Sequence, residues 1–356
     1  NFITQRIAYG FLVMFGVISV VFFLFNILPG DPARMMLDQR EDAQQLQNIR
    51  AKYAFDKSYS EQYLLYLNDL SPLSIHSQSP SSYTNLASKE YHYYSLLSLS
   101  NYDIILKYPY LRTSFNKSGK SVSSIIAETL PNTIVLAVSS ITIAIVFGLL
   151  IGIIAAIFKD SWIDKLALLF GVFGMSIPSF FSAILIAWIF GFVLHDFTSL
   201  NMTGSLYSVD DYGRGEYLSV SNLILPALTL GIRPLAVIIQ LTRASFLETL
   251  SKDFVRTAVA KGLSFKRVLS KHVLKNSLNP VITAVSGWFA SLLAGAVFVE
   301  YIFAWNGLGK EIVDALNQLD LPVVMGSVLT IAIMFICINI LVDLIYAALD
   351  PRIKMN

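Results

Sequence analysis

The chain has few of the residues that usually carry out chemistry. It contains one cysteine, Cys337, and four scattered histidines, which excludes an internal disulfide and leaves no metal-ligand spacing. Charged residues make up only 14% of the sequence, compared with about 25% in a soluble domain. The deficit is concentrated in long apolar runs, so we predict a protein that crosses a membrane several times.

Six apolar runs reach the length of about 20 residues that a helix needs to cross the hydrocarbon core. They lie at 7–28, 132–157, 166–194, 223–243, 281–303 and 324–347. The first run is too long for the apolar core of a typical signal peptide, and no small-residue cleavage site follows it. We therefore expect an all-α, polytopic fold with six transmembrane helices, and the first of them, at 1–28, is expected to be retained.

A polar segment at 29–130 separates the first span from a predicted five-helix core at 131–356. Residues 38–70 are charged and are predicted to be helical, whereas residues 71–100 are rich in serine and tyrosine and are predicted to be irregular. We expect a mostly helical external insert. Its many tyrosines fit either a docking surface or an aromatic fringe at the membrane interface.

The short loops predict the orientation of the spans. With the N-terminus inside, the cytoplasmic ends and loops hold 13 lysines and arginines, whereas the two short external loops hold only Arg214 and Lys310. Positive residues are enriched in cytoplasmic loops. Both termini are therefore expected in the cytoplasm.

Residues 251–275, called the coupling segment below, form the most distinctive stretch of the chain. From residue 251 to 278 the sequence has seven lysines and arginines against one acid, Asp253. Ser251 and Ser264 can each cap a helix, and Gly262 separates the two helices. Five residues of the second helix share an apolar face: Phe265, Val268, Leu269, His272 and Val273. The pattern fits either docking to a soluble partner or a basic anchor on anionic lipid.

The candidates for a translocation path are Ser176, Pro178, Ser179, Arg233 and Gln240. Pro178 should bend the third span, which could form a cavity wall or a simple kink. An arginine at the bilayer centre costs roughly 2.5–3.5 kcal/mol, so Arg233 is expected to face a cavity or an acid, or to extend toward the outer surface. Gly148 and Gly152 form a GxxxG pattern that fits close helix packing.

The sequence Gly119-Lys120-Ser121 is similar to the end of a nucleotide-binding P-loop. The first glycine of that motif would fall at Ser114, however, and the segment is predicted to be external, away from ATP. The chain is therefore not expected to hydrolyse ATP.

Eight short motifs occur in a fixed order along the chain. They are LPGDP at 28–32, LPNT at 130–133, RTAVAKGL at 256–263, NSLNP at 276–280, VEYIF at 299–303, GLG at 307–309, DLIYA at 343–347 and LDPRI at 349–353. Together they resemble the peptide branch of binding-protein-dependent ABC importers, in particular the first of the two permease subunits of dipeptide and oligopeptide systems. The resemblance covers about residues 1–37 and 120–356.

The resemblance implies the type I ABC importer permease fold in an inner membrane and short peptides as the substrate. It also implies a second homologous permease, two cytoplasmic ATPase subunits and an external solute-binding protein as partners, with membrane lipid and no nucleic acid. The ATPase subunits would bind ATP and magnesium, and this chain would need no cofactor. The coupling segment resembles helices that insert into a groove on the ATPase, and the residues expected there are Asp253, Arg256, Thr257, Ala258, Lys261 and Gly262.

Two stretches depart from the family pattern. The general coupling motif begins Glu-Ala-Ala, but here it begins Arg256-Thr257-Ala258, as is usual in the peptide branch, and Val259 replaces a frequent arginine. Residues 108–114 stand where a Gly-Asp-Leu-Gly element usually precedes the second span, so the contact with the binding protein and the substrate stay open.

Other function classes fit less well. A secondary transporter would need coupling-ion sites at mid-membrane, and the predicted spans hold almost no acids. A membrane-embedded enzyme would need a catalytic pair, which the spans lack. Among importers, nickel or another small solute is the chief alternative to peptides.

Overall fold

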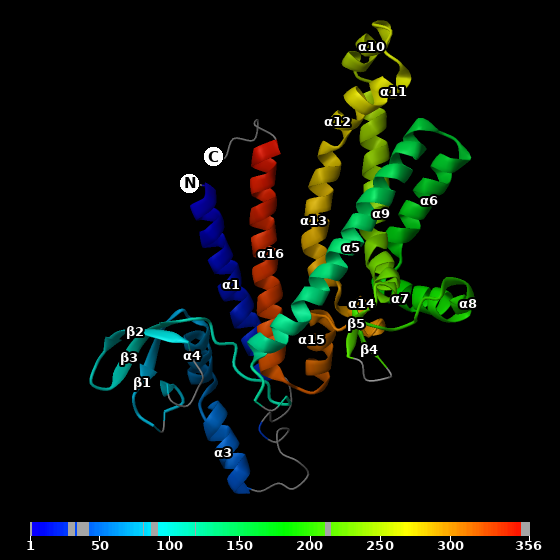
Figure 1. Ribbon diagram of the computed structural model, residues 1–356. Helices are drawn as coiled ribbons and strands as arrows, with labels where there is room; N and C mark the ends of the chain where they lie inside the picture. The colour runs from blue at the N-terminus through cyan, green and yellow to red at the C-terminus, as the bar shows by residue number, and fades with distance from the viewer. Residues whose placement is uncertain are drawn as a thin grey trace. The chain divides into compact units, whose positions relative to one another are not determined.

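The computed structural model describes residues 2–27, 33, 43–80, 82–86, 92–117, 119–210 and 215–349. Figure 1 shows its helices and strands. The chain divides into two compact units. The first consists mainly of Ile3–Glu128 with Glu311–Ala332, and the second of Thr129–Lys310 with the chain from Ile333 onward. The division near residue 128 is close to the predicted end of the insert, but the first unit also takes in part of the predicted five-helix core.

Four helices are long and apolar enough to cross a membrane: α1 (Phe2–Ile27), α5 (Val122–Ile157), α9 (Ser221–Leu250) and α16 (Leu321–Leu349). The predicted third span is a bent pair, α6 (Trp162–Ser176) and α7 (Ser179–Trp188). The predicted fifth span is the shorter apolar helix α13 (Asn279–Gly295), which α14 (Val297–Ile302) follows. These elements are consistent with six spans.

The bend in the third span falls at Pro178, where the sequence predicts it. The helical stretches on either side of it meet at 111°. A proline has no backbone N–H and fixes its own φ, so the α6 ladder ends before it and α7 starts after it. A π-helical turn, Ile189–Val193, and the short helix α8 (His195–Thr198) follow α7.

The insert begins with two helices, α3 (Ala43–Tyr53) and α4 (Tyr59–Leu70). A reciprocal capping box starts α4: the Glu61 backbone N–H donates to the Ser58 hydroxyl at 3.3 Å, and the Ser58 N–H donates to the Glu61 carboxylate at 3.1 Å. This arrangement satisfies two of the free N–H groups of a helix start. The predicted helical character of residues 38–70 is confirmed for α3 and α4.

The prediction of an irregular stretch at 71–100 is wrong, because this part of the insert contributes to a three-stranded antiparallel sheet. The strands are β1 (Leu73–Ser77), β2 (Tyr93–Ser98) and β3 (Tyr102–Lys107), in the order β1-β3-β2. Along β1 the polar Ser74 and His76 alternate with the apolar Leu73 and Ile75, and this period of two is typical of a strand. The insert is therefore mixed rather than mostly helical.

The buried Asp69 organises the contact between α4 and the sheet. Its carboxylate accepts hydrogen bonds from Arg112 Nε and from the Tyr83 hydroxyl, both at 2.9 Å. The Arg112 guanidinium lies 5.1 Å from the Tyr66 ring centre and 5.7 Å from that of Tyr83. The Lys107 ammonium donates to the Asp69 backbone carbonyl. Burial of these groups raises the pKa of Tyr66 to about 12 and lowers the pKa of Lys107 to about 8.

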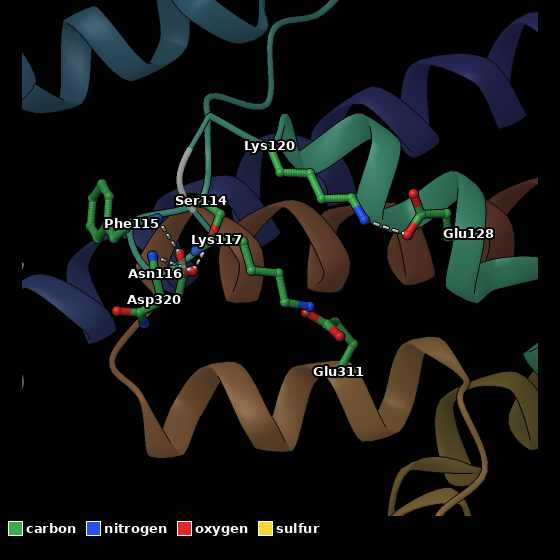
Figure 2. Close-up of polar contacts among 8 residues, drawn as sticks. All are labelled: Ser114, Phe115, Asn116, Lys117, Lys120, Glu128, Glu311 and Asp320. Carbon is green, nitrogen blue, oxygen red and sulfur yellow. Dashed lines mark hydrogen bonds and ion pairs between the residues drawn. The ribbon is translucent and has the colours of Figure 1, made fainter.

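The loop before α5 wraps the Asp320 carboxylate, as Figure 2 shows. This carboxylate accepts from the Ser114 hydroxyl and from the backbone N–H groups of Phe115, at 3.1 Å, and Asn116, at 3.2 Å. Lys117 forms an ion pair with Glu311. Asp320 immediately precedes α16, so the stretch with a P-loop-like ending binds an acid of its own chain and fixes the start of the last long helix.

In the second unit α9 packs against α5, α6, α7 and α13. The predicted close packing of the GxxxG pattern in α5 is confirmed. A Cβ atom at Gly148 would lie 2.6 Å from Ile238 Cγ2, and one at Gly152 would lie 2.7 Å from Thr242 Cβ. Only glycine permits α9 to approach α5 this closely.

Three further pieces complete the described chain. A hairpin of β4 (Tyr207–Val209) and β5 (Glu216–Leu218) precedes α9. The coupling segment after α9 contains α10 (Asp253–Ala260), α11 (Phe265–Val268) and a π-helical turn (Leu269–Val273), and it ends within α12 (Leu274–Ser277). The helix α15 (Leu308–Asn317) follows α14 and precedes α16 in the chain.

Candidate functional site

The coupling segment has the predicted order of helix, glycine corner and helix. Gly262 has φ +79°, in the left-handed region that glycine adopts at low cost. The expected Ser251 cap is wrong, because its hydroxyl donates to the Glu248 carbonyl at the end of α9 and Lys252 occupies the cap position. Ser264 does occupy the cap position of α11, although its side chain makes no capping hydrogen bond.

The helix α10 has a buried face and an exposed face. Val255 and Ala258 are buried in an apolar cluster with Ala156 of α5 and Phe246 of α9. The expectation that Ala258 enters a partner's groove is therefore wrong for its side chain, which is only 5% exposed and packs against its own subunit. Its small size serves this internal contact.

The other predicted coupling residues lie on the exposed side. Thr257 donates to the Asp253 carbonyl at 2.9 Å, and Arg256 lies 3.6 Å from the Asp253 carboxylate. Two apolar side chains share this exposure, Phe254 at 41% and Val259 at 56%. The sequence motif alone did not single out these two.

The second half of the segment forms the predicted apolar face only in part. Val268 and Val273 are buried in the same cluster as α10, whereas Phe265 is 60% exposed. The π-helical turn between them adds one residue to the repeat, so residues on either side of it no longer share one stripe. The position of this helix along a membrane surface stays a prediction.

Two polar contacts of α9 lie close in sequence to the coupling segment. The Ser245 hydroxyl of α9 donates to the Ser277 carbonyl of α12 at 2.9 Å. The Arg243 guanidinium of α9 donates to both oxygens of the buried Asp164 carboxylate, in the first turn of α6. Asp164 also accepts from the Asp160 backbone N–H at 2.9 Å. Nothing in the sequence marked Asp164, because its partner lies 79 residues away.

A cavity of about 60 Å³ lies between α7, α9 and α13. Its polar lining comes from hydroxyl groups and one arginine: Ser179, Ser182, Thr229, Ser291 and Arg233. Two predicted path residues, Ser179 and Arg233, thus line one cavity, and Trp288 adds an aromatic wall. Within the part of the chain that the structure describes, no acid forms an ion pair with Arg233.

The remaining predicted path residues do not line this cavity. Ser176 donates to the Val172 carbonyl at 2.8 Å, and Pro178 forms the bend. Gln240 lies against α6, where a Cβ atom at Gly171 would be 2.7 Å from its amide nitrogen.

A second buried carboxylate, Glu300, holds three of the sequence motifs together. It is fully buried and accepts from the backbone N–H groups of Gly309, at 2.7 Å, and Lys310, at 3.1 Å. A carboxylate at a helix start is favoured by the free N–H groups there. The Leu308 N–H donates to the Thr133 hydroxyl at 2.8 Å. The LPNT, VEYIF and GLG motifs therefore meet at the start of α15.

Comparison with known proteins identifies the chain's family. Residues 148–355 match the family described as binding-protein-dependent transport system inner membrane component, and residues 1–79 match its N-terminal counterpart. The chain belongs to this family. A dipeptide transport system permease protein, DppB, from Alkalihalophilus pseudofirmus is 32% identical over 355 residues, covering 96% of each chain.

Two further likenesses were found. The glutathione transport system permease protein GsiC from Escherichia coli strain K12 is 32% identical over 355 residues and covers 99% of each chain. Among solved structures, a chain of the MetNI methionine ABC transporter in an inward-facing conformation aligns with 64% of this chain and 97% of its own, with a TM-score of 0.48 and 16% identity.

This protein is accordingly a membrane permease subunit of an ABC importer. The motifs at 28–32 and 350–353 lie outside the described residues, although the family matches include them. The GLG and VEYIF motifs have a physical role in this chain, because a Cβ atom at Gly307 would lie 2.4 Å from the Glu300 carboxylate.

Proposed function

We propose that the chain forms half of the translocation pathway for short peptides. Two relatives that match 96% to 99% of the chain are named for the transport of a dipeptide and of glutathione, itself a short peptide. A second homologous permease would supply the other half, and an external solute-binding protein would deliver the substrate. Two ATPase subunits would bind ATP and magnesium.

The exposed face of α10 carries the proposal for coupling. Phe254 and Val259 expose apolar surface on either side of the buried Val255 and Ala258, so α10 offers apolar groups that a groove on another protein could cover. A basic lipid anchor explains this face less well, because α10 itself holds one acid, Asp253, and one base, Arg256, and so carries no net charge. The lysines at 266, 271 and 275 lie in the second half of the segment.

The contacts of α10 within the subunit would couple a movement of α10 to the spans. Val255 and Ala258 bind α10 to α5 and α9 through the apolar cluster, and Arg243 binds α9 to α6 through Asp164. When ATP closes the ATPase subunits, movement of α10 would shift these helices together. The ATP-bound state would then favour one access state of the permease pair.

Arg233 and the hydroxyl-lined cavity are proposed to face the permeation path. A charge on a span is most stable beside water, a substrate or an acid of the second permease. Arg233→Leu should reduce uptake and leave assembly intact, whereas Ser176→Ala, outside the cavity, should change neither. If Arg233→Leu leaves uptake unchanged and only makes the protein more stable, the cavity plays no part in transport.

The experiment for the function is uptake by proteoliposomes that contain the co-expressed complex and its binding protein. We expect ATP-dependent accumulation of radiolabelled dipeptides and tripeptides and none of nickel ions. Accumulation of nickel alone would contradict the peptide proposal and leave the importer class intact.

The proposed orientation places both termini and the coupling segment in the cytoplasm. In a Cys337→Ser background, a membrane-impermeant maleimide added outside intact cells should label Ser98→Cys in the insert and leave Ser264→Cys unlabelled. The reverse pattern would contradict this topology.

A further inference from the structure

In the three-stranded sheet of the insert, most polar side chains lie on the covered face and most apolar side chains on the uncovered face. Alternate residues of a strand point to opposite faces. The covered face carries three buried polar residues, Ser74, His76 and Lys107, together with one buried apolar residue, Ile105. A water-exposed antiparallel sheet has the reverse arrangement, with its apolar face covered and its polar face solvated. The uncovered face of this sheet therefore needs an apolar neighbour.

The register of the strands defines this face. Six apolar residues from the three strands form two cross-strand rows: Leu73, Leu106 and Tyr94 in one, and Ile75, Ile104 and Leu97 in the other. Five of the six are exposed, and Ile104 is half-buried. No charged residue of the three strands lies on this face, since Asp103 and Lys107 both belong to the opposite one. We call these six residues the apolar sheet face.

The polar residues on the covered face are well satisfied. His76 lies 3.0 Å from the Ser74 hydroxyl and 2.8 Å from the Thr84 carbonyl, and Lys107 donates to the Asp69 carbonyl. A slip of one residue would bury the apolar set and expose the polar set. The hydrogen bonds on the covered face oppose such a slip, so the exposed apolar face is a specified feature of the fold.

The sheet is attached to the first membrane span through α4. The Tyr63 hydroxyl lies 2.6 Å from the Ser19 hydroxyl of α1, and the Phe22 ring contacts the rings of Tyr63 and Tyr66. Ser19 and Phe22 belong to the stretch Ala8–Phe25 that is apolar enough to cross the membrane. The helix α4 therefore lies at the level of the bilayer surface.

The sheet follows α4 directly. The Asn68 side chain of α4 both donates to the Ile75 carbonyl, at 3.0 Å, and accepts from the Ile75 N–H, at 2.9 Å. Only two residues, 71 and 72, separate α4 from β1. The sheet is thus held against α4, and α4 in turn contacts α1.

We propose that the apolar sheet face rests on lipid, in the leaflet that surrounds the part of α1 that α4 contacts. A face with no charge and with Tyr94 among its exposed residues suits the boundary between headgroups and acyl chains. The contact would hold the insert to the bilayer beside α1 and limit its movement during the transport cycle. This inference concerns the insert alone and does not depend on the identity of the substrate.

Two adjacent tyrosines give a matched test. Tyr94 belongs to the apolar sheet face, whereas Tyr93 lies on the opposite face, where it pairs with Lys107. Both tyrosines are exposed. In a Cys337→Ser background, Tyr94→Cys and Tyr93→Cys each receive a nitroxide spin label, and the whole complex is placed in phosphatidylcholine–phosphatidylglycerol nanodiscs. We expect the label at 94 to collide more often with oxygen, which partitions into lipid, than with water-soluble nickel-EDDA, and the label at 93 to show the reverse.

Equal access of nickel-EDDA to both labels would overturn the proposal, because the face would then lie in water. Shielding of the label at 94 from both reagents only after the binding protein is added would also overturn it, in favour of a protein contact. Leu97→Cys and Ser98→Cys form a second pair on the same strand, with Leu97 on the apolar sheet face. This pair applies if a tyrosine variant fails to fold.

Discussion

The Arg243 guanidinium donates to both oxygens of the Asp164 carboxylate and so ties the start of α6 to α9, ten residues before the coupling segment's first helix. Asp164 is almost fully buried, and Arg243 is largely shielded from solvent. A two-pronged pair of this kind fixes both the distance and the orientation of the two helices. The pair thus joins two helices of the spans near the start of α10.

We predict that loss of either partner destabilises the subunit. Removal of one member of a buried ion pair costs about 3–5 kcal/mol, and the partial exposure of Arg243 places this pair near the lower end. Asp164→Asn and Arg243→Gln should each lower the thermal midpoint in detergent, and the double variant should lose much less than the sum. Additive losses in this double-mutant cycle would show that the two side chains do not stabilise each other.

The effect of a substitution at Gly262 should depend only on how readily the new residue adopts the left-handed backbone conformation. Nothing lies within 4 Å of a Cβ atom built there, so a side chain meets no steric clash. A residue other than glycine in the left-handed region costs roughly 1–2 kcal/mol, and asparagine less than a β-branched residue. We expect hydrogen exchange in residues 253–263 to rise strongly in Gly262→Val and slightly in Gly262→Asn. Equal exchange in both variants would contradict this.

The Lys107 ammonium should make the stability of the insert depend on pH. Its pKa is about 8 in the folded protein, because burial disfavours the charged form, compared with 10.5 for the free side chain. Between these values the unfolded chain binds more protons, so the free energy of unfolding rises with pH. Tyr66 acts in the opposite direction above about pH 10, since its pKa is raised to about 12.

Resistance of the insert to pulse proteolysis in the full-length protein should therefore increase from about pH 8 toward about pH 10. Lys107→Gln keeps an N–H donor and removes the titrating group, and its digestion also controls for the pH dependence of the protease. If wild type and Lys107→Gln show the same pH profile, Lys107 does not titrate in this range.

The Glu300 carboxylate should hold the start of α15. Glu300→Ala leaves the Gly309 and Lys310 N–H groups without their acceptor, and a buried unsatisfied donor costs about 1–3 kcal/mol. Glu300→Gln keeps one acceptor oxygen and should cost less. Glu128→Gln is the control, because it breaks only an exposed ion pair with Lys120, which contributes at most about 1 kcal/mol. Equal thermal midpoints for Glu300→Ala and Glu128→Gln would contradict the role of Glu300.

Much of the fold could be predicted from local pattern. The long apolar runs predict the spans, Pro178 predicts the bend, and Gly262 predicts the corner because one residue type determines each feature. The sheet in the insert was missed because its strands are short, two of them contain serines, and its central strand β3 pairs with β1 and β2, which both precede it in the chain. Such pairing leaves no mark within one strand.

The site was predictable in its position but not in its faces. The motif located α10, and the helical period alone could not tell which side packs on α5 and α9, so Ala258 was assigned to the wrong face. The contacts of Asp164 with Arg243 and of Glu300 with Gly309 needed the structure. In the first case the partners are far apart in sequence, and in the second a turn has to bring the helix start back onto the carboxylate.

The most direct test concerns the exposed face of α10 in the reconstituted complex. Val259→Glu places a charge on the face proposed to enter the ATPase groove, whereas Ser270→Glu places the same charge on an exposed position of the second half of the segment. Ala258→Glu is unsuitable, because it would disrupt the internal cluster. We predict that Val259→Glu abolishes stimulation of ATP hydrolysis by loaded binding protein, and uptake with it, while Ser270→Glu retains both. Normal stimulated hydrolysis and uptake with Val259→Glu, or equal loss in both variants, would contradict coupling through α10.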